Sequence, residues 1–501
     1  MFSYCRKGRR RTARSSFAKG KHDMSLITDM IRRKSVAAMQ QETGERSGLR
    51  RVLGLWQLTA IGLGGIIGVG IFVLTGTVAA TQAGPAVVLS FLLAGIASGA
   101  AALCYAEFSG LIPVSGSAYT YGYAVLGEFA GWVIGWDLLL EYALIAAVVA
   151  VGWSGYVQAL LDAAGVHLPV WAQGAYGSAP GRLFNLPAVV VSLAITALLA
   201  MRMQWGARFN TTIVAIKIAA AAGIVIAGAA YVKPERWHPF MPFGMHGVVT
   251  GAAVVFFAVF GYDMLTTAAE ESRHPQRDLP RAVLLSLAIA MLLYFAICLV
   301  LTGIVPYTTL DTPAPVASAF TAIGLPQVMV AISLASICGI TSVIFANLLA
   351  GARIWFALSR DGLLPGWFAK VHPRWHTPHR TTVLLGTVTA VASGLFPLDE
   401  LAKLVNIGVL SAFIVICTAV AVLRWRHPDL ERPFRTPLVP LVPIIGVGFS
   451  CWLIWGLPSI TYWRFGLWLV VGLLVYVGYG RRHSRLNTSG DEMAAVTESS
   501  S

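Results

Sequence analysis

The sequence predicts an all-α integral membrane protein with twelve transmembrane helices, built as a five-plus-five inverted repeat in which spans 1 and 6 are broken. Three observations lead to this prediction. Hydrophobic residues make up 56% of the chain and charged residues only 12%, whereas soluble domains carry about 25% charged residues. Apolar runs long enough to cross a bilayer recur along the chain. Two of these runs, five spans apart, are interrupted by glycine at a similar depth, which is the pattern that inverted repeats produce.

Twelve segments meet the requirement of about 20 mainly apolar residues for a spanning helix. Their continuous apolar character excludes a β-barrel, in which apolar and polar residues alternate. The predicted spans are 54–80, 86–112, 125–153, 187–203, 210–231, 247–270, 281–305, 327–357, 381–397, 400–423, 437–457 and 465–480. The predicted units are a basic, disordered cytoplasmic tail (1–50), a first repeat (51–231, spans 1–5), a second repeat (247–423, spans 6–10), spans 11 and 12 (437–480) and a polar, disordered cytoplasmic tail (481–501).

The net charge of +14 is distributed as the membrane topology requires. Much of it lies in the first fifty residues, as in "RKGRRRTAR" (Arg6–Arg14), and in alternate short loops. If the N-terminus is cytoplasmic, the outer loops hold only four basic residues, Arg182, Lys233, Arg236 and Arg464. Because basic loops stay in the cytoplasm, both termini are predicted to be cytoplasmic, in a multi-pass protein of the inner or plasma membrane. The charge therefore indicates a lipid surface and no nucleic-acid partner.

Two spans contain residues that weaken a helix. The first holds "GLGGIIGVG" (Gly62–Gly70), and the sixth holds Gly261 and Asp263 within "VVFFAVFGYDML" (Val254–Leu265). Close helix packing through small residues is one explanation. The other is a pair of helix breaks that face a cavity, because freed backbone groups are not tolerated in lipid. Freed N–H groups suit a carboxylate and freed carbonyls suit an ammonium, so the paired breaks predict a site for a zwitterion.

Several long motifs resemble one known family. They are "GLWQLTAIGLGGIIGVGIFVLTG" (Gly54–Gly76), "LCYAEFSGLIPVSGSAYTY" (Leu103–Tyr121), "GWDLLLEYALIAAVVAVGWSGY" (Gly135–Tyr156), "FFAVFGYDMLTTAAEESRHPQRDLPRA" (Phe256–Ala282) and "ARIWFALSRDGLLP" (Ala352–Pro365). From about residue 50 to 480 the chain resembles the cationic amino acid transporter family of the amino acid–polyamine–organocation (APC) superfamily. This resemblance implies the APC/LeuT-like fold, with broken helices 1 and 6, and amino acid uptake.

The resemblance also implies six positions around the substrate, which are Ile66, Gly68, Val69, Gly70, Phe257 and Phe260. The amides of residues 68–70 match those that bind the substrate carboxylate. The carbonyls of Ile66 and Phe260 match those that bind its amino group. Phe257 occupies the aromatic gate position on the outer side.

Lys217 is the only charged residue in "TTIVAIKIAAAAGIVIAG" (Thr211–Gly228). A charge at this depth is costly and therefore a functional candidate; snorkelling or a plain structural ion pair are the alternatives. By resemblance to proton-coupled members, its ammonium contacts the carbonyls of Gly64 and Ile67 and the hydroxyl of Ser342. Since the pKa of a buried lysine shifts readily, Lys217 is predicted to couple transport to protons.

Four further polar side chains lie within predicted spans. Glu141 is the candidate counter-ion for a cationic substrate side chain, with a helix-packing hydrogen bond as the alternative. Asp137 is expected nearer the cavity mouth or in a structural contact, and Asp263 is a candidate for stabilising freed N–H groups. Asn347 is shorter than the methionine common in bacterial relatives, which favours a larger or more polar substrate; a hydrogen bond to a neighbouring helix is the alternative.

The remaining motifs predict no cofactor or metal and no enzymatic activity. "HPRWHTPHR" (His372–Arg380) holds three histidines but no cysteine or carboxylate, and the chain contains no phosphate loop and no nucleophile elbow. Glu107, Glu270 and Glu271 are expected to pair with loop arginines. The six cysteines are expected to act as small apolar residues.

The sequence therefore predicts a secondary active transporter, a proton-coupled symporter of amino acids that prefers cationic ones such as arginine, lysine or ornithine. A permease for neutral amino acids, an uncoupled exchanger and a non-transporting amino acid sensor are the alternatives. The expected partners are the amino acid, the proton and the lipid bilayer, and the sequence leaves an accessory membrane subunit open.

Overall fold

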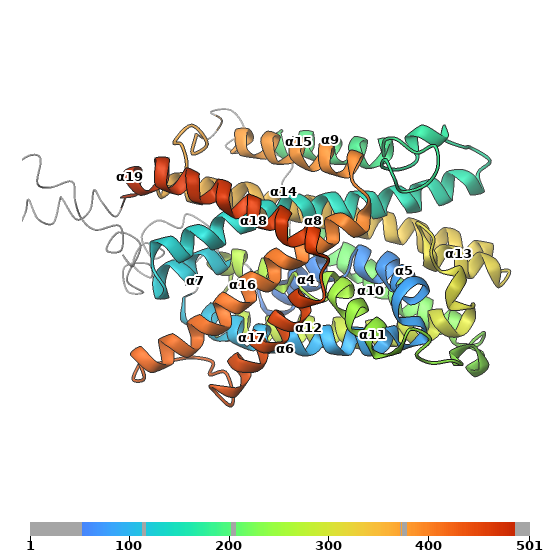
Figure 1. Ribbon diagram of the computed structural model, residues 1–501, viewed down its shortest axis with the longest axis horizontal. Helices are drawn as coiled ribbons and strands as arrows, with labels where there is room; N and C mark the ends of the chain where they lie inside the picture. Colours follow the sequence, from blue (N-terminus) through green and yellow to red (C-terminus); the bar gives the residue numbers. More distant parts are fainter. Residues whose placement is uncertain (1–52, 113–116, 202–206, 371, 373–377, 486–501) are drawn as a thin grey trace, which may run out of the picture.

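The computed structural model describes residues 53–112, 117–201, 207–370, 372 and 378–485. Within these ranges the regular structure is helical, with two isolated β-bridges and no strand. Figure 1 shows most helices running along the long axis of the molecule. The prediction of an all-α membrane protein is confirmed. The predicted N-terminal tail, most of the C-terminal tail and five residues of the histidine-containing motif lie outside the described residues.

The helix bounds follow the predicted order. The first half of the chain forms α4 (Leu55–Ile66), η1 (Gly70–Leu74), α5 (Thr75–Val78), η2 (Ala79–Ala83), α6 (Val87–Leu111), α7 (Ser117–Val125), α8 (Glu128–Ala163), α9 (Leu186–Ala200) and α10 (Ala207–Ala229). The second half forms α11 (Gly244–Val255), η6 (Phe256–Ala258), η7 (Tyr262–Glu271), α12 (Pro275–Ile304), α13 (Pro315–Ala322), α14 (Pro326–Arg360), α15 (His379–Leu395), α16 (Leu398–Arg426), α17 (Leu441–Trp455), α18 (Ser459–Val475), η9 (Tyr476–Gly480) and α19 (Arg481–His483).

Helical structure occupies each of the twelve predicted ranges, although the number of membrane crossings stays a prediction. Within the described residues, eight helical segments are long and apolar enough to cross a membrane, and three apolar helices are shorter. The sequence missed α7 and α13 because helices of nine and eight residues are too short for the spanning criterion. The ordered chain also continues past the predicted boundary at 480, since α19 and Ser484 are defined and Ser484 is buried.

The helices pack into two groups that meet along the broken segments. One group contains α4, α6, α11, η7 and α12, which contact one another closely. The other contains α8, α9, α14 and α15, where α14 packs along α8 and α15 along α9. In Figure 1, α9 and α15 lie at one edge of the molecule and α6, α12 and α17 near the opposite edge. Helix α10 bridges the groups because it packs against α4, α12 and α14.

Glycines allow the two broken segments to touch at both ends of the breaks. A Cβ atom on Gly70 would lie 2.3 Å from the Cβ of Ala258, and one on Gly65 would lie 2.5 Å from the carbonyl oxygen of Gly261. Gly261 itself has φ +107°, a conformation that side-chain-bearing residues rarely adopt. Gly65 and Gly70 of span 1 therefore allow a close approach between the two breaks.

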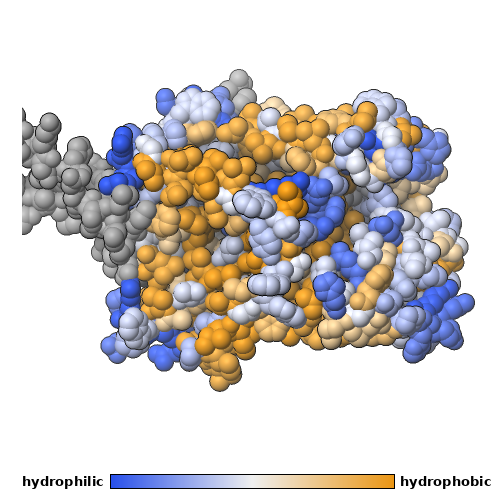
Figure 2. Space-filling model, viewed as in Figure 1, coloured by the Kyte–Doolittle hydropathy of each residue, from blue (hydrophilic) through white to orange (hydrophobic). Residues whose placement is uncertain are grey.

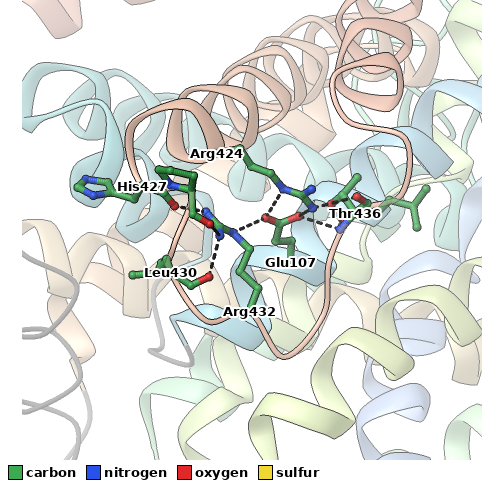
Figure 3. A network of polar contacts seen from close by, with 8 residues as sticks. Glu107, Arg424, His427, Leu430, Arg432 and Thr436 are labelled. Carbon is green, nitrogen blue, oxygen red and sulfur yellow. Dashed lines mark hydrogen bonds and ion pairs between the residues drawn. The ribbon is translucent and has the colours of Figure 1, made fainter.

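A buried carboxylate fastens the end of α6 to α16 and the loop after it (Figure 3). The Arg424 guanidinium donates to Glu107 at 2.7 and 3.1 Å, Arg432 forms a 3.0 Å ion pair with it, and the Thr436 amide donates at 2.8 Å. The predicted pairing of Glu107 with loop arginines is thus confirmed. Glu271 forms no ion pair within the described part of the chain, and the side chain of Glu270 lies outside the description.

The close approach at Gly70 predicts that an added methyl group destabilises the protein there but not at an open glycine position. Gly70→Ala should lower the free energy of unfolding by about 1–3 kcal/mol or more, because the Ala258 backbone cannot move aside easily. The matched control is Gly223→Ala in α10, where a Cβ meets nothing within 4 Å. Thermal unfolding of the purified variants measures both effects, and equal melting temperatures would contradict the proposed contact.

Candidate functional site

The break in span 1 exposes three successive amides. Helix α4 ends at Ile66, Ile67 is extended (φ −78°, ψ 101°), and η1 starts at Gly70. Apart from regular helix bonding, the amides of Gly68, Val69 and Gly70 have no backbone acceptor among the described residues. Because these amides begin a helical segment, they carry partial positive charge and suit a carboxylate.

The break in span 6 exposes carbonyl groups opposite these amides. Element η6 ends at Ala258, η7 begins at Tyr262, and the left-handed Gly261 turns the chain between them. The contacts of Gly65 with Gly261 and of Gly70 with Ala258 bring the two breaks together. The structure therefore juxtaposes the residues that the sequence pairs around one substrate.

Side chains from three neighbouring helices satisfy most of the freed carbonyls. The Tyr294 hydroxyl lies 2.8 Å from the carbonyls of both Ile66 and Ala258. The Ser98 hydroxyl donates to Val259 at 2.5 Å. The Asn406 amide donates to Ala253 at 2.6 Å and to Val254 at 3.3 Å.

The Phe260 carbonyl lies between η6 and η7, and no hydrogen bond to it is found among the described residues. Buried carbonyls are almost always paired, so this oxygen is available to a ligand. The Phe260 ring is buried and packs edge-on against Phe257, with ring centroids 5.5 Å apart. Phe257, the predicted gate, thus lies beside the available carbonyl.

Lys217, which lies on α10, forms hydrogen bonds to the C-terminal end of α4. Its ammonium donates to the carbonyls of Gly64 at 3.0 Å and Ile67 at 3.1 Å, as the resemblance implied, and the side chain is fully buried. A Cβ on Gly339 of α14 would lie 2.8 Å from Lys217 Cγ, so this glycine makes room for the lysine. Ser342 donates instead to Gly339 at 2.8 Å, and no bond joins it to Lys217. No carboxylate pairs with Lys217 within the described ranges.

Three acidic side chains, Asp137, Glu141 and Asp263, are buried close enough together to interact electrostatically. Asp263 accepts a 3.1 Å hydrogen bond from Tyr142. Asp137 packs against Gly408 of α16, and its Oδ1 atom has no partner among the described groups. Glu141 is 4% exposed, and no hydrogen bond or ion pair to it is found in the described chain.

Asn347 is buried in α14. Its side-chain nitrogen donates to the Val343 carbonyl at 2.8 Å, one turn earlier on the same helix. Its Oδ1 atom has no partner among the described residues. The predicted alternative of a bond to a neighbouring helix is therefore not what this conformation shows, and the free oxygen can accept a hydrogen bond from a ligand.

A cavity of about 200 Å³ lies beside the break in span 1. Its lining includes Leu53, Glu271 and Arg353, and also Gly64, Met264 and Ser342. Glu271 and Arg353 lie at the predicted cytoplasmic side. The cavity thus lies between the α4–η7 pair and α14. It is next to Gly64, whose carbonyl accepts a hydrogen bond from Lys217.

A membrane protein whose two broken helices meet at a buried polar site has the architecture of a membrane transport protein. Comparisons with known proteins define its family. The signature of the family described as "Amino acid permease" matches residues 53–477, and the chain belongs to this family.

Relatives of this chain carry several substrate names. The methylthioribose transporter of Bacillus subtilis is 49% identical over 92% of this chain and 100% of its own length. The branched-chain amino acid permease BcaP of Bacillus subtilis is 45% identical over 91% of this chain and 99% of its own length. A vacuolar cationic amino acid transporter of Arabidopsis thaliana is 35% identical over 86% of this chain and 68% of its own length. The resemblance to APC-superfamily permeases is confirmed, and the relatives indicate a transporter rather than an enzyme.

Tyr294 allows a test of whether one hydroxyl stabilises both breaks, because it bonds a carbonyl in each. A hydroxyl has one proton and donates to one carbonyl at a time, so Tyr294→Phe leaves both buried carbonyls without this donor. We expect a loss of about 1–3 kcal/mol in stability and a marked loss of substrate uptake. Tyr462→Phe, which removes an exposed hydroxyl bonded to Ile454, is the control. Uptake by the Tyr294 variant equal to that of the control would refute the role.

Proposed function

We propose that the protein is a secondary active transporter that imports amino acids together with protons. The observation that carries this proposal is the contact between the two breaks, one of which starts a helical segment at the amides of residues 68–70 while the other leaves the Phe260 carbonyl without a hydrogen bond among the described residues. These groups complement the carboxylate and ammonium of one amino acid without using side-chain charge. The proposal includes twelve crossings, the inverted repeat, and cytoplasmic termini in the cell membrane.

Lys217 is the proposed proton-coupling residue. Its protonated ammonium makes charge-assisted bonds to Gly64 and Ile67, which are about twice as strong as neutral ones. Proton release weakens the link between α10 and the end of α4, on which the substrate amides depend. The proton therefore binds one arrangement of the α4–α6–α11–α12 group, inward-open or outward-open, more tightly than the other. This difference in affinity shifts the equilibrium between the two arrangements.

For the substrate side chain we propose a cation, with Glu141 as its counter-ion. A buried carboxylate without a partner is costly, and a guanidinium or ammonium would relieve that cost. Asn347, whose Oδ1 is free, would accept a hydrogen bond at the same end of the substrate. A neutral substrate is the second candidate, because the relatives at 49% and 45% identity carry the names of a methylthioribose transporter and a branched-chain permease.

Proteoliposomes with an imposed pH difference test the coupling. Wild-type protein should accumulate substrate when the outside is acidic, whereas Lys217→Ala should only equilibrate it, because its ammonium link to α4 is lost. Lys233→Ala, an exposed lysine in the loop after α10, is the control. Gradient-driven accumulation by the Lys217 variant would remove it as the coupling residue. Equilibration without accumulation by wild-type protein would identify an uncoupled exchanger.

Competition among substrates tests the side-chain preference. Uptake is measured with arginine, leucine, alanine and methylthioribose as competitors, in wild-type protein and in Glu141→Gln. With a cationic substrate, the variant should lose arginine transport by about tenfold or more, the equivalent of one charge-assisted bond. Leucine transport that dominates in wild-type protein and persists in Glu141→Gln would favour the neutral candidate.

A further inference from the structure

A second cavity, of about 430 Å³, has no residue of the broken helices in its lining, and its exposed Leu467 and Val471 place it on an apolar outer surface of the molecule. Leu140 and Leu144 of α8 form its floor, and α15, α16 and α18 form its walls. Its apolar lining includes Phe396, Leu401, Leu467 and Val471. Two charged residues, Glu400 and Arg464, complete the lining at one end. We call this cavity the lateral groove.

Exposed tryptophans indicate the depth in the membrane at which the charged end of the lateral groove lies. Trp455 and Trp463, at the junction of α17 and α18, are 85% and 78% exposed. Exposed tryptophans of this kind mark a membrane–water interface. Arg464 therefore lies at interface depth. Val471 is seven residues further along α18, about 10 Å deeper by the rise of an α-helix. The lateral groove thus runs from the head-group region into the hydrocarbon.

The charges at the interface occur as two ion pairs. Arg464 lies 2.8 Å from Glu400, and both side chains are 41% exposed. Lys403 lies 2.9 Å from Asp399 on the adjacent row of α16. The four groups sum to zero net charge with both signs accessible. Figure 2 shows a hydrophilic patch that interrupts the hydrophobic face where Figure 1 draws the start of α18.

The shape of the groove decides between two apolar occupants. A spanning helix is about 10–12 Å across with its side chains, so a 10 Å length of it occupies roughly 800–1,100 Å³. The groove, at about 430 Å³, has less room than that. A single acyl chain is thinner and flexible. Because the surroundings are bilayer hydrocarbon, an acyl chain is the occupant that the membrane itself supplies.

We propose that the lateral groove is a specific site for one phospholipid with a zwitterionic head group. One acyl chain lies on Leu140 and Leu144, the phosphate meets Arg464, and the head-group ammonium meets Glu400. Leu140 and Leu144 flank Glu141 on α8, so the bound lipid packs behind the helix that carries this residue. The site is independent of which amino acid the protein carries.

Native mass spectrometry of the full-length protein in detergent tests binding directly. The probes are a phosphatidylethanolamine and a phosphatidylglycerol with identical acyl chains, added at equal concentration. Leu467→Trp fills the groove, and Leu474→Trp is the matched control on the same helix outside it. Leu467 and Leu474 are 67% and 68% exposed in the wild-type chain. We expect one retained phosphatidylethanolamine in wild-type and control protein, and at least about tenfold less in Leu467→Trp.

The ion pair provides a selectivity test. Glu400→Gln leaves a net positive charge beside the groove, so the preference should shift from phosphatidylethanolamine toward the anionic phosphatidylglycerol. Equal lipid retention by Leu467→Trp and Leu474→Trp would overturn the proposal, as would no retained lipid in wild-type protein. A dimer that Leu467→Trp dissociates would overturn it too, since a second copy would then cover the groove. An unchanged lipid preference in Glu400→Gln would overturn the head-group assignment.

Discussion

The fold depends on where backbone hydrogen bonds go when two helices are interrupted inside a membrane. Lipid offers no partners for freed amides and carbonyls, so every interruption needs neighbours that supply them. Here the breaks of spans 1 and 6 contact each other through Gly65, Gly70 and Gly261. Tyr294, Ser98, Asn406 and Lys217 then bond the freed carbonyls. The groups that remain without a bond there among the described residues include the amides of residues 68–70 and the Phe260 carbonyl, and these define the candidate binding site.

Much of this arrangement could be predicted from the sequence because its signals are local. Apolar length predicts the helices, and glycine within an apolar run predicts a break. A single lysine among apolar residues stands out for the same reason, and the resemblance to known permeases supplied its partners Gly64 and Ile67. The ion pairs of Glu107 follow from its position near the loops that carry the arginines.

The supporting side chains could not be predicted, because their roles depend on tertiary packing. Tyr294, Ser98 and Asn406 are ordinary polar residues within apolar helices, and no spacing distinguishes them from interfacial or packing residues. The resemblance also implied a contact that the structure does not contain. Ser342 was expected to contact Lys217, but its hydroxyl donates to Gly339 of its own helix. The conformation of Asn347 likewise depends on its rotamer, which a sequence does not specify.

The buried contact at Glu107 constrains how the molecule can move. It joins α6, a member of the group that contains both breaks, to α16 and to the chain leading into α17. A carboxylate with two guanidiniums and an amide is expensive to separate. If the broken-helix group tilts during transport, this end of α16 must travel with it. Because α16 also packs against α8, where Gly408 makes room for Asp137, a tilt of one helix group relative to the other acts on this helix at two points.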